Sequence, residues 1–236
     1  MSIIDSVKST LFVSIHPAGT PFVVIFSFIT VLIGWIWSPL FFLGVVLTIW
    51  CIYFFRNPKR FHPVDEDNRL VISPADGKIV EITELIPDDE IGLPKTKYIK
   101  VGVFMNVFDV HVNRSPMKGK ILNKNYIPGV FFNASLDKAS KENERLSLTM
   151  DIGSGRKVGF VQIAGLIARR IIANVDIGSE LKAGEVFGLI RFGSRVDVYF
   201  PIESRVKVLI GQTSIAGETV IAKLNEKKSV KKPSRK

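Results

Sequence analysis

The sequence is poor in the side chains that bind metals and form cross-links. Cys51 is the single cysteine among 236 residues, which excludes an internal disulfide framework and a cysteine-rich zinc site. The three histidines, at positions 16, 62 and 111, are far apart in the chain, and a histidine-rich metal site is therefore not expected. We accordingly predict no metal site.

Charge is missing from one long stretch near the N-terminus. Pro21–Phe55 is a run of 35 residues without Asp, Glu, Lys or Arg, too long for one ordinary membrane span of about 20 residues. A Ser-Pro pair at 38–39 divides it into Phe22–Trp37 and Leu40–Phe55, each of 16 residues. Three arrangements stay open: two short tilted spans, a re-entrant hairpin, or one long kinked helix. A signal peptide is rejected, because the stretch is too long and no small-residue cleavage site follows it.

The rest of the chain is basic. Lys and Arg number 32 against 22 Asp and Glu, a net charge of +10, and Lys223–Lys236 supplies +6 of it. Arg56, Lys59 and Arg60 follow the apolar stretch at once, whereas Lys8 is the only basic residue before it. The positive-inside tendency predicts a protein of the cell membrane with its C-terminal domain on the cytoplasmic side. The expected partner of the tail is an anionic membrane surface, and nucleic acid is not expected because the tail lacks interleaved aromatics.

Residues after the apolar stretch alternate as β-strands do. Val196, Val198 and Phe200 share one face of a strand, and polar residues lie between them. The only good helical candidate is Ala134–Arg145. We predict a mostly β domain, a barrel or sandwich with few helices, preceded by a hydrophobic membrane hairpin. Further strand-like runs are Gly77–Leu85, Tyr98–Met105, Gly119–Tyr126, Leu146–Ile152, Lys157–Ala164, Val186–Arg191 and Arg205–Ile210.

One motif occurs twice. Segments 178–185 and 211–218 share the pattern G-x4-A-G-E, and an apolar run follows each. The arrangement resembles the strands of biotinyl and lipoyl carrier domains, and Ser73–Val80 looks like the opening strand of such a domain. No exposed lysine sits in the tight hairpin that a carrier needs, so the resemblance concerns architecture and not cofactor attachment. A non-catalytic, membrane-anchored adaptor of this architecture is one interpretation.

Three clusters are candidates for chemistry. Gly193 and Ser194 interrupt a strand pattern, which allows an unusual backbone angle and places the Ser194 hydroxyl beside the preceding carbonyl; a β-bulge or turn is the alternative. Asp109 and His111 are two residues apart, so a strand would put both on one face. An ordinary core or surface histidine is the alternative there. Asp76, in the sequence S-P-A-D-G, is the third candidate, and a plain turn with an exposed Asp is its alternative.

Together, these motifs resemble the phosphatidylserine decarboxylase proenzyme family in its short bacterial and archaeal form. The resemblance extends from the apolar hairpin to about residue 222, and the ordered set is far more specific than any single piece. The matching segments are Phe54–Pro58, Ser73–Lys78, Phe108–Pro116, Tyr126–Gly129, Asn133–Ala134, Asp137–Ser140, Asn143–Arg145, Gln162–Gly165 and Phe192–Asp197.

The resemblance implies a chain that cuts itself between Gly193 and Ser194. The products would be a β chain of residues 1–193 and an α chain of residues 194–236 that begins with a pyruvoyl group. The processing relay would consist of Asp76, His111 and Ser194. Long family members carry a second histidine where this sequence has Arg114, and the resemblance leaves three roles open for His111: processing, turnover or both. The implied organisation is a membrane segment 1–55, a decarboxylase domain 56–222 and a basic tail 223–236.

The resemblance also implies the reaction. Phosphatidylserine would form a Schiff base with the pyruvoyl group made from Ser194, lose CO₂ and leave as phosphatidylethanolamine, without metal or added cofactor. Arg114 and Arg195 are candidates to bind the lipid phosphate or carboxylate, and surface ion pairs are the alternative. Archaetidylserine is the alternative substrate, because its reacting headgroup is identical. The α and β chains would be partners of each other, and a homo-oligomer is left open.

Overall fold

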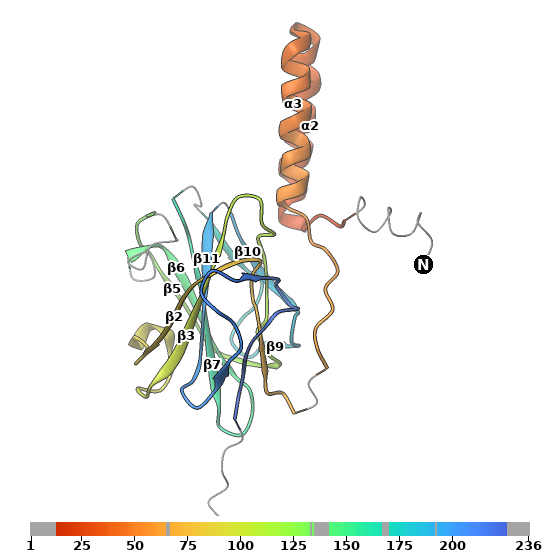
Figure 1. Ribbon diagram of the computed structural model, residues 1–236. Coiled ribbons are helices and arrows are strands. Elements are labelled where there is room, and N and C mark those ends of the chain that lie inside the picture. The colour runs from red at the N-terminus through yellow and green to blue at the C-terminus, as the bar shows by residue number, and fades with distance from the viewer. Residues whose placement is uncertain are drawn as a thin grey trace, which may run out of the picture.

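The computed structural model describes residues 13–64, 67–132, 134, 142–166, 170–191 and 193–225. A helical hairpin projects from a mostly β domain (Figure 1), so the predicted fold class is confirmed. The helix predicted over Ala134–Arg145 falls largely outside the described residues, and Arg145 itself begins a strand. The basic tail beyond residue 225 also lies outside them.

The two apolar segments form two helices that lie side by side. A short turn, η1 (Pro17–Gly19), leads into α2 (Thr20–Ile36), and α3 (Ser38–Phe54) follows after one extended residue, Trp37. Proline is tolerated in the first turn of α3 because the N–H that it lacks would have no helical partner there. The two helices turn back on each other (Figure 1), which excludes one long kinked helix. Each is about 25 Å long at about 1.5 Å per residue.

Small and hydroxyl side chains bring the two helices together. A Cβ on Gly44 would lie 2.6 Å from Thr30 Oγ1, so the glycine permits this close approach. The hydroxyls of Thr30 and Thr48 are 3.2 Å apart, and each donates to a carbonyl of its own helix. Apolar side chains cover the outside of the hairpin, where Trp35 is 92% exposed and Ile36 is 85% exposed. Such a surface is unfavourable in water and suits a bilayer, and residues 17–36 are long and apolar enough to cross one.

The β domain consists of one large antiparallel sheet and two small ones. Its strands are β1 (Leu70–Ile72), β2 (Gly77–Leu85), β3 (Tyr98–Met105), β4 (Val112–Arg114), β5 (Gly119–Ile127), β6 (Arg145–Asp151), β7 (Lys157–Ile163), β8 (Ile171–Ala173), β9 (Glu180–Leu181), β10 (Val186–Ile190), β11 (Ser194–Pro201), β12 (Arg205–Val206), β13 (Thr213–Ser214) and β14 (Val220–Lys223). A short turn, η2 (Asp89–Ile91), follows β2. The large sheet has the order β13-β2-β3-β11-β7-β6-β5-β9, and the small sheets have the orders β1-β14-β12 and β4-β10-β8.

The two halves of the large sheet have equivalent strands in opposite order, which reveals an internal twofold repeat. Strands β13-β2-β3-β11 correspond to β9-β5-β6-β7, and the sheet β1-β14-β12 corresponds to β4-β10-β8. Ser73–Ile79 reads S-P-A-D-G-K-I and Ser115–Ile121 reads S-P-M-K-G-K-I, at equivalent places before β2 and β5. The register then shifts at equivalent positions in both strands, after Ile79 and after Ile121. The domain therefore contains two copies of one unit, and the second copy (β4–β10) is inserted in the chain between β3 and β11 of the first.

The two G-x4-A-G-E segments are equivalent turns of this repeat. Gly178 and Gly211 have φ of +94° and +87°, and Gly184 and Gly217 have φ of +74° and +79°. Glycine adopts these left-handed angles without the penalty of a side chain. Gly178 and Gly184 flank the two-residue strand β9 and lead into β10. Gly211 and Gly217 flank the two-residue strand β13 and lead into β14. The sequence repeat is thus also a repeat of backbone conformation.

Two apolar clusters fix the parts of the molecule relative to each other. The main core lies within the β domain, and the alternating Val196, Val198 and Phe200 of β11 are fully buried in it. A second cluster joins the base of the hairpin to the sheet β4-β10-β8, and it includes Phe54 and Leu189. Burial of one such side chain stabilises a fold by about 1.5–3 kcal/mol. The end of α3 is therefore packed firmly against the strand that follows His111.

Candidate active site

The Gly193-Ser194 pair lies at the point where β11 begins. Gly193 has φ +60°, the unusual backbone angle expected of a glycine at this position. Ser194 is fully buried and pairs with Met105 of β3. Among the described residues, no hydrogen-bond partner exists for its Oγ. Buried hydroxyls normally have a partner, so this hydroxyl is an exception that a chemical role would explain.

His111 approaches this pair from the segment just before β4. Its Nδ1 lies 3.0 Å from the carbonyl oxygen of Asp109, which can only accept, so Nδ1 carries the proton. The N–H of Gly193 donates to the other nitrogen, Nε2, at 3.3 Å. Burial lowers the pKa of His111 to about 4, the carbonyl contact opposes this, and the charge of Arg56 adds to it. The imidazole is thus neutral at pH 7, with its proton-accepting nitrogen at the Gly193-Ser194 pair.

Gly165 leaves room for the carbonyl oxygen of Gly193. A Cβ on Gly165 would lie 1.5 Å from that oxygen, so no other residue fits without movement of the chain. The preceding residue, Ala164, is held on both sides: its carbonyl accepts from Asn143 Nδ2 at 2.7 Å, and its N–H donates to the Glu144 carbonyl at 2.9 Å. Asn143 and Gly165 together therefore define where the Gly193 carbonyl can lie.

Asp76 lies on a neighbouring turn. Its carboxylate accepts from Arg60 at 2.7 Å and from the N–H of Ala216 at 2.7 Å. No hydrogen bond joins Asp76 to His111 in the part of the chain that the structure describes. Burial raises the pKa of Asp76, whereas Arg60 and the Ala216 N–H lower it. The structure thus brings His111, Gly193 and Ser194 together, and it leaves Asp76 in a separate ion pair.

Asp109 and His111 are neighbours, but not as two side chains on one face of a strand. Asp109 belongs to a turn in which its Oδ2 accepts from the Asn106 N–H at 2.8 Å. The Asn106 Oδ1 in turn accepts from the Phe108 N–H at 2.8 Å. Because the carboxylate closes this turn, only the main-chain carbonyl of Asp109 reaches the imidazole. The expected strand geometry is therefore wrong at this position.

Arg114 lies at the end of β4, close to the base of the hairpin. Its guanidinium donates to the carbonyls of Gly184 at 3.0 Å and Pro58 at 2.9 Å, and to Asn57 Oδ1 at 2.7 Å. All three partners are uncharged. With Lys59 and others, Arg114 lines a cavity of about 380 Å³. Its positive charge is therefore available to an anionic group in that cavity.

Arg195 has very different surroundings. It is fully buried and forms ion pairs with Asp197 of its own strand and Glu81 of β2, and Lys100 binds Glu81 at 2.7 Å. A Cβ on Gly102 would lie 2.4 Å from the guanidinium, so the glycine makes space for it. The structure places Arg195 inside an ionic cluster of the sheet, directly after Ser194, and not on a surface.

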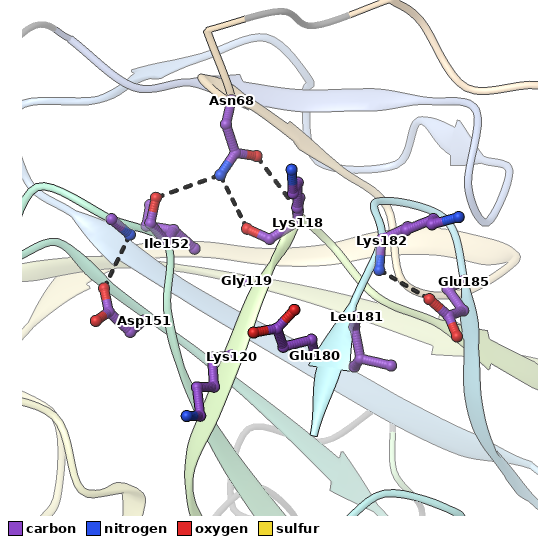
Figure 2. Close-up of a pocket in the computed structure, with 11 residues that line it drawn as sticks. Asn68, Lys118, Gly119, Lys120, Asp151, Ile152, Glu180, Leu181, Lys182 and Glu185 are labelled. Atoms are coloured by element: carbon purple, nitrogen blue, oxygen red, sulfur yellow. Dashed lines mark hydrogen bonds between the residues drawn. The ribbon is translucent and has the colours of Figure 1, made fainter. Parts of the chain in front are cut away.

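The second copy of the repeat has a cavity of its own. It has a volume of about 740 Å³, and its lining includes Lys118, Lys182 and Glu185 (Figure 2). Lys118 occupies the place that Asp76 has in the first copy, and Glu185 that of Glu218. Neither histidine nor serine is among the residues that line it. The cluster of His111 and Ser194 thus has no equivalent in this cavity.

Comparison with known proteins identifies the family. A family model described as phosphatidylserine decarboxylase matches residues 47–222, a range that contains every candidate site residue above. The chain belongs to the phosphatidylserine decarboxylase family. The phosphatidylserine decarboxylase proenzymes of Rickettsia rickettsii (strains Sheila Smith and Iowa) and Rickettsia africae (strain ESF-5) are each 53% identical to it over 219 residues, 93% of this chain and 94% of theirs. The resemblance predicted from the motifs is confirmed, and the chain is a decarboxylase, not a non-catalytic adaptor.

Two residues that frame the site of this phosphatidylserine decarboxylase family member were not predicted from the sequence as site residues. Phe54 packs its ring on the imidazole of His111, with centroids 4.2 Å apart. No local pattern distinguishes it, because it is one apolar residue within a long apolar run. Gly165 had a weak signal, since it ends the Q-I-A-G segment that matches the family, but only the fold shows which atom it faces.

Proposed function

We propose that this protein is a self-processing, pyruvoyl-dependent phosphatidylserine decarboxylase of the cell membrane. One observation carries the proposal: the neutral Nε2 of His111 accepts a hydrogen bond from the N–H of Gly193, the residue directly before Ser194, whose Oγ is buried and has no partner among the described residues. A histidine base next to a hydroxyl is the arrangement that activates a serine nucleophile. The proposed role of Asp76 in the same relay rests on the family resemblance.

In the proposed processing, the Oγ of Ser194 attacks the carbonyl carbon of Gly193 and gives its proton to His111. The bond from that carbon to the Ser194 nitrogen breaks, the nitrogen takes up a proton, and an ester joins the two residues. Removal of the Ser194 α-proton then expels the Gly193 carboxylate by β-elimination. The dehydroalanine that remains takes up one water and releases one ammonia, which leaves a ketone at residue 194. Gly165 leaves the space that the Gly193 carbonyl oxygen occupies before the attack, so the carbonyl is already placed next to Ser194.

The surroundings of residue 194 fit a small ketone. The position is fully buried, its side-chain oxygen has no partner among the described residues, and His111 contacts the N–H of the residue before it. Where the structure describes the chain, no group of three or more His, Cys, Asp or Glu could hold a metal ion. The pyruvoyl group supplies the electron sink that loss of CO₂ from a serine headgroup requires. His111 is the side chain placed to move a proton there.

The position of the site suits a lipid substrate. His111 lies at the base of the apolar hairpin, and the basic Arg56, Lys59 and Arg60 follow the hairpin directly. We place this base at the cytoplasmic surface by the positive-inside tendency, with segment 1–55 in the membrane, domain 56–222 outside it and tail 223–236 attracted to anionic lipid. Arg114, in the cavity beside Lys59, is the proposed contact for the phosphate or carboxylate of the substrate.

Release of labelled CO₂ tests this function. The full chain in bilayer nanodiscs is given phosphatidylserine labelled in the serine carboxyl group, and, in a parallel arm, archaetidylserine with the same label. We expect release from phosphatidylserine by the wild type and by Ser204→Ala, whose hydroxyl only donates to the Pro201 carbonyl at 2.6 Å, and none by Ser194→Ala. Release from the ether lipid alone would favour the archaetidylserine alternative. Release by Ser194→Ala would contradict the proposal.

A further inference from the structure

The last turn of α3 lies directly against the proposed catalytic histidine. The rings of Phe54 and His111 are inclined by 33°, with centroids 4.2 Å apart, and both side chains are fully buried. Phe54 also contacts the ring of Phe55 at 5.0 Å, and Phe55 stacks on Phe22 of α2 at 5.6 Å. A chain of aromatic contacts thus joins both helices of the hairpin to the imidazole.

We propose that Phe54 is a positioning residue for His111, and that the base of the hairpin is one wall of the reaction site. The inference rests on the proposed role of His111. The imidazole has one productive orientation, in which Nδ1 meets the Asp109 carbonyl and Nε2 meets Gly193. Rotation about its side-chain bonds would break both contacts. A ring packed on its face at this distance opposes such rotation.

Phe54 also keeps water away from the imidazole. Burial is the largest cause of the lowered pKa of His111. The charge that acts on the ring is that of Arg56, just after α3, and the Asp109 main chain contacts it. Arg56 also interacts with the Asp109 and Asp76 carboxylates, and Lys78 interacts with Asp109. From the start of β11, the neutral Gly193 N–H faces it. A smaller side chain at position 54 would admit water, and the pKa of His111 would move back toward its ordinary value.

The pH dependence of self-cleavage tests the inference. The full chain is made by cell-free synthesis into nanodiscs, and the rate of cleavage is measured from pH 5 to pH 8. We expect the wild type to lose little rate at pH 5.5, because a group with a pKa of about 4 is still unprotonated. A solvated imidazole with a pKa of about 6.5 is about nine-tenths protonated at pH 5.5, so Phe54→Ala should cleave roughly tenfold more slowly there than at pH 8. Phe54→Leu retains an apolar side chain against the imidazole, so its rate of cleavage should fall less at pH 5.5 than that of Phe54→Ala.

Phe55→Ala is the matched control. Phe55 belongs to the same cluster and is equally buried, but its ring packs on Phe22 and Phe54. We expect Phe55→Ala to keep the wild-type pH profile. Equal shifts for Phe54→Ala and Phe55→Ala, or no shift for either, would overturn the inference. Failure of the wild type to cleave at any pH would instead contradict the proposed function.

A direct titration covers the case in which Phe54→Ala does not fold. In the Ser194→Ala background, the His111 imidazole is titrated by NMR with Phe54 and with Leu at that position. We expect a pKa near 4 with Phe54, and a value raised toward 6.5 with Leu. The same pKa in both proteins would overturn the inference.

Discussion

The Nε2 atom of His111 accepts a hydrogen bond from the N–H of Gly193, 82 residues further along the chain, at 3.3 Å. The contact requires the tautomer with the proton on Nδ1, which the Asp109 carbonyl fixes. It places a neutral base at the N–H of Gly193, one residue before Ser194, next to the peptide bond that the proposed processing breaks.

Ser194→Ala is expected to stop self-cleavage without loss of stability. The Oγ has no partner in the described structure, so its removal leaves no other group unpaired and should change the free energy of unfolding by less than about 1 kcal/mol. Ser115→Ala is the control, because this buried hydroxyl donates to the Met117 carbonyl at 2.7 Å. It should cost about 1 kcal/mol and leave cleavage intact. Gel analysis and thermal unfolding measure the two properties, and cleaved Ser194→Ala chain would refute the prediction.

Gly165→Ala should block cleavage by displacing the Gly193 carbonyl. The added Cβ would lie 1.5 Å from the carbonyl oxygen, and either the oxygen or the Ala164–Gly165 turn must move. Gly153→Ala is a suitable control: no atom lies within 4 Å of its Cβ, but its φ of +87° makes alanine strained. That control should lose about 1–2 kcal/mol of stability and still cleave. If Gly165→Ala cleaved at the rate of Gly153→Ala, the proposed role of Gly165 in placing the Gly193 carbonyl would be wrong.

His111 should make the uncleaved protein less stable in acid. Its pKa is about 4 in the folded chain and about 6.5 when unfolded, so between these values the unfolded state binds the additional proton. Stability is therefore lost as the pH falls. From pH 7.5 to pH 5 the loss from this one group is about 2 kcal/mol. Chemical denaturation of Ser194→Ala with and without His111→Gln measures it, and an identical pH dependence of both proteins would disprove the assignment.

Arg195 is predicted to stabilise the fold and not to bind the substrate. Its removal in Arg195→Met leaves Asp197 and Glu81 with less compensation in the sheet interior, and loss of one partner of a buried ion pair costs about 3–5 kcal/mol. Arg114→Met, beside an open cavity, should instead raise KM for the lipid with a smaller change in stability. Denaturant titration measures the loss of stability in each variant, and decarboxylation kinetics measure the change in KM. A raised KM with unchanged stability in Arg195→Met would favour the direct substrate contact considered from the sequence.

Much of the fold could be predicted because its long strands alternate clearly. Gly77–Leu85 and Tyr98–Met105 were predicted with the bounds that β2 and β3 have, and the break between the two apolar helices falls at Trp37, next to the Ser-Pro pair. The strands β1, β4 and β8 were missed because three residues are too short to show a period. Arg205–Ile210 was predicted as one strand, but only Arg205–Val206 pairs as β12.

The site was predictable only where a motif marked it. Gly193, Ser194 and His111 were found through their motifs, and the fold brings them together. The contact of Phe54 with His111 depends on how the hairpin packs on the sheet β4-β10-β8, which no local pattern encodes. The burial of Arg195 could not be predicted either, because its ion pair with Glu81 joins strands that are distant in the sequence.

The N-terminus of the C-terminal fragment tests the central claim most directly. Intact-mass measurement of the purified protein under denaturing conditions should find two chains, residues 1–193 and 194–236. The smaller chain should be lighter by one ammonia than a fragment that begins with serine, because residue 194 has become a ketone. The two chains should separate only after denaturation, since β11 lies between β3 and β7 in the large sheet. A single uncut chain, or a small chain that begins with a free serine, would contradict the account.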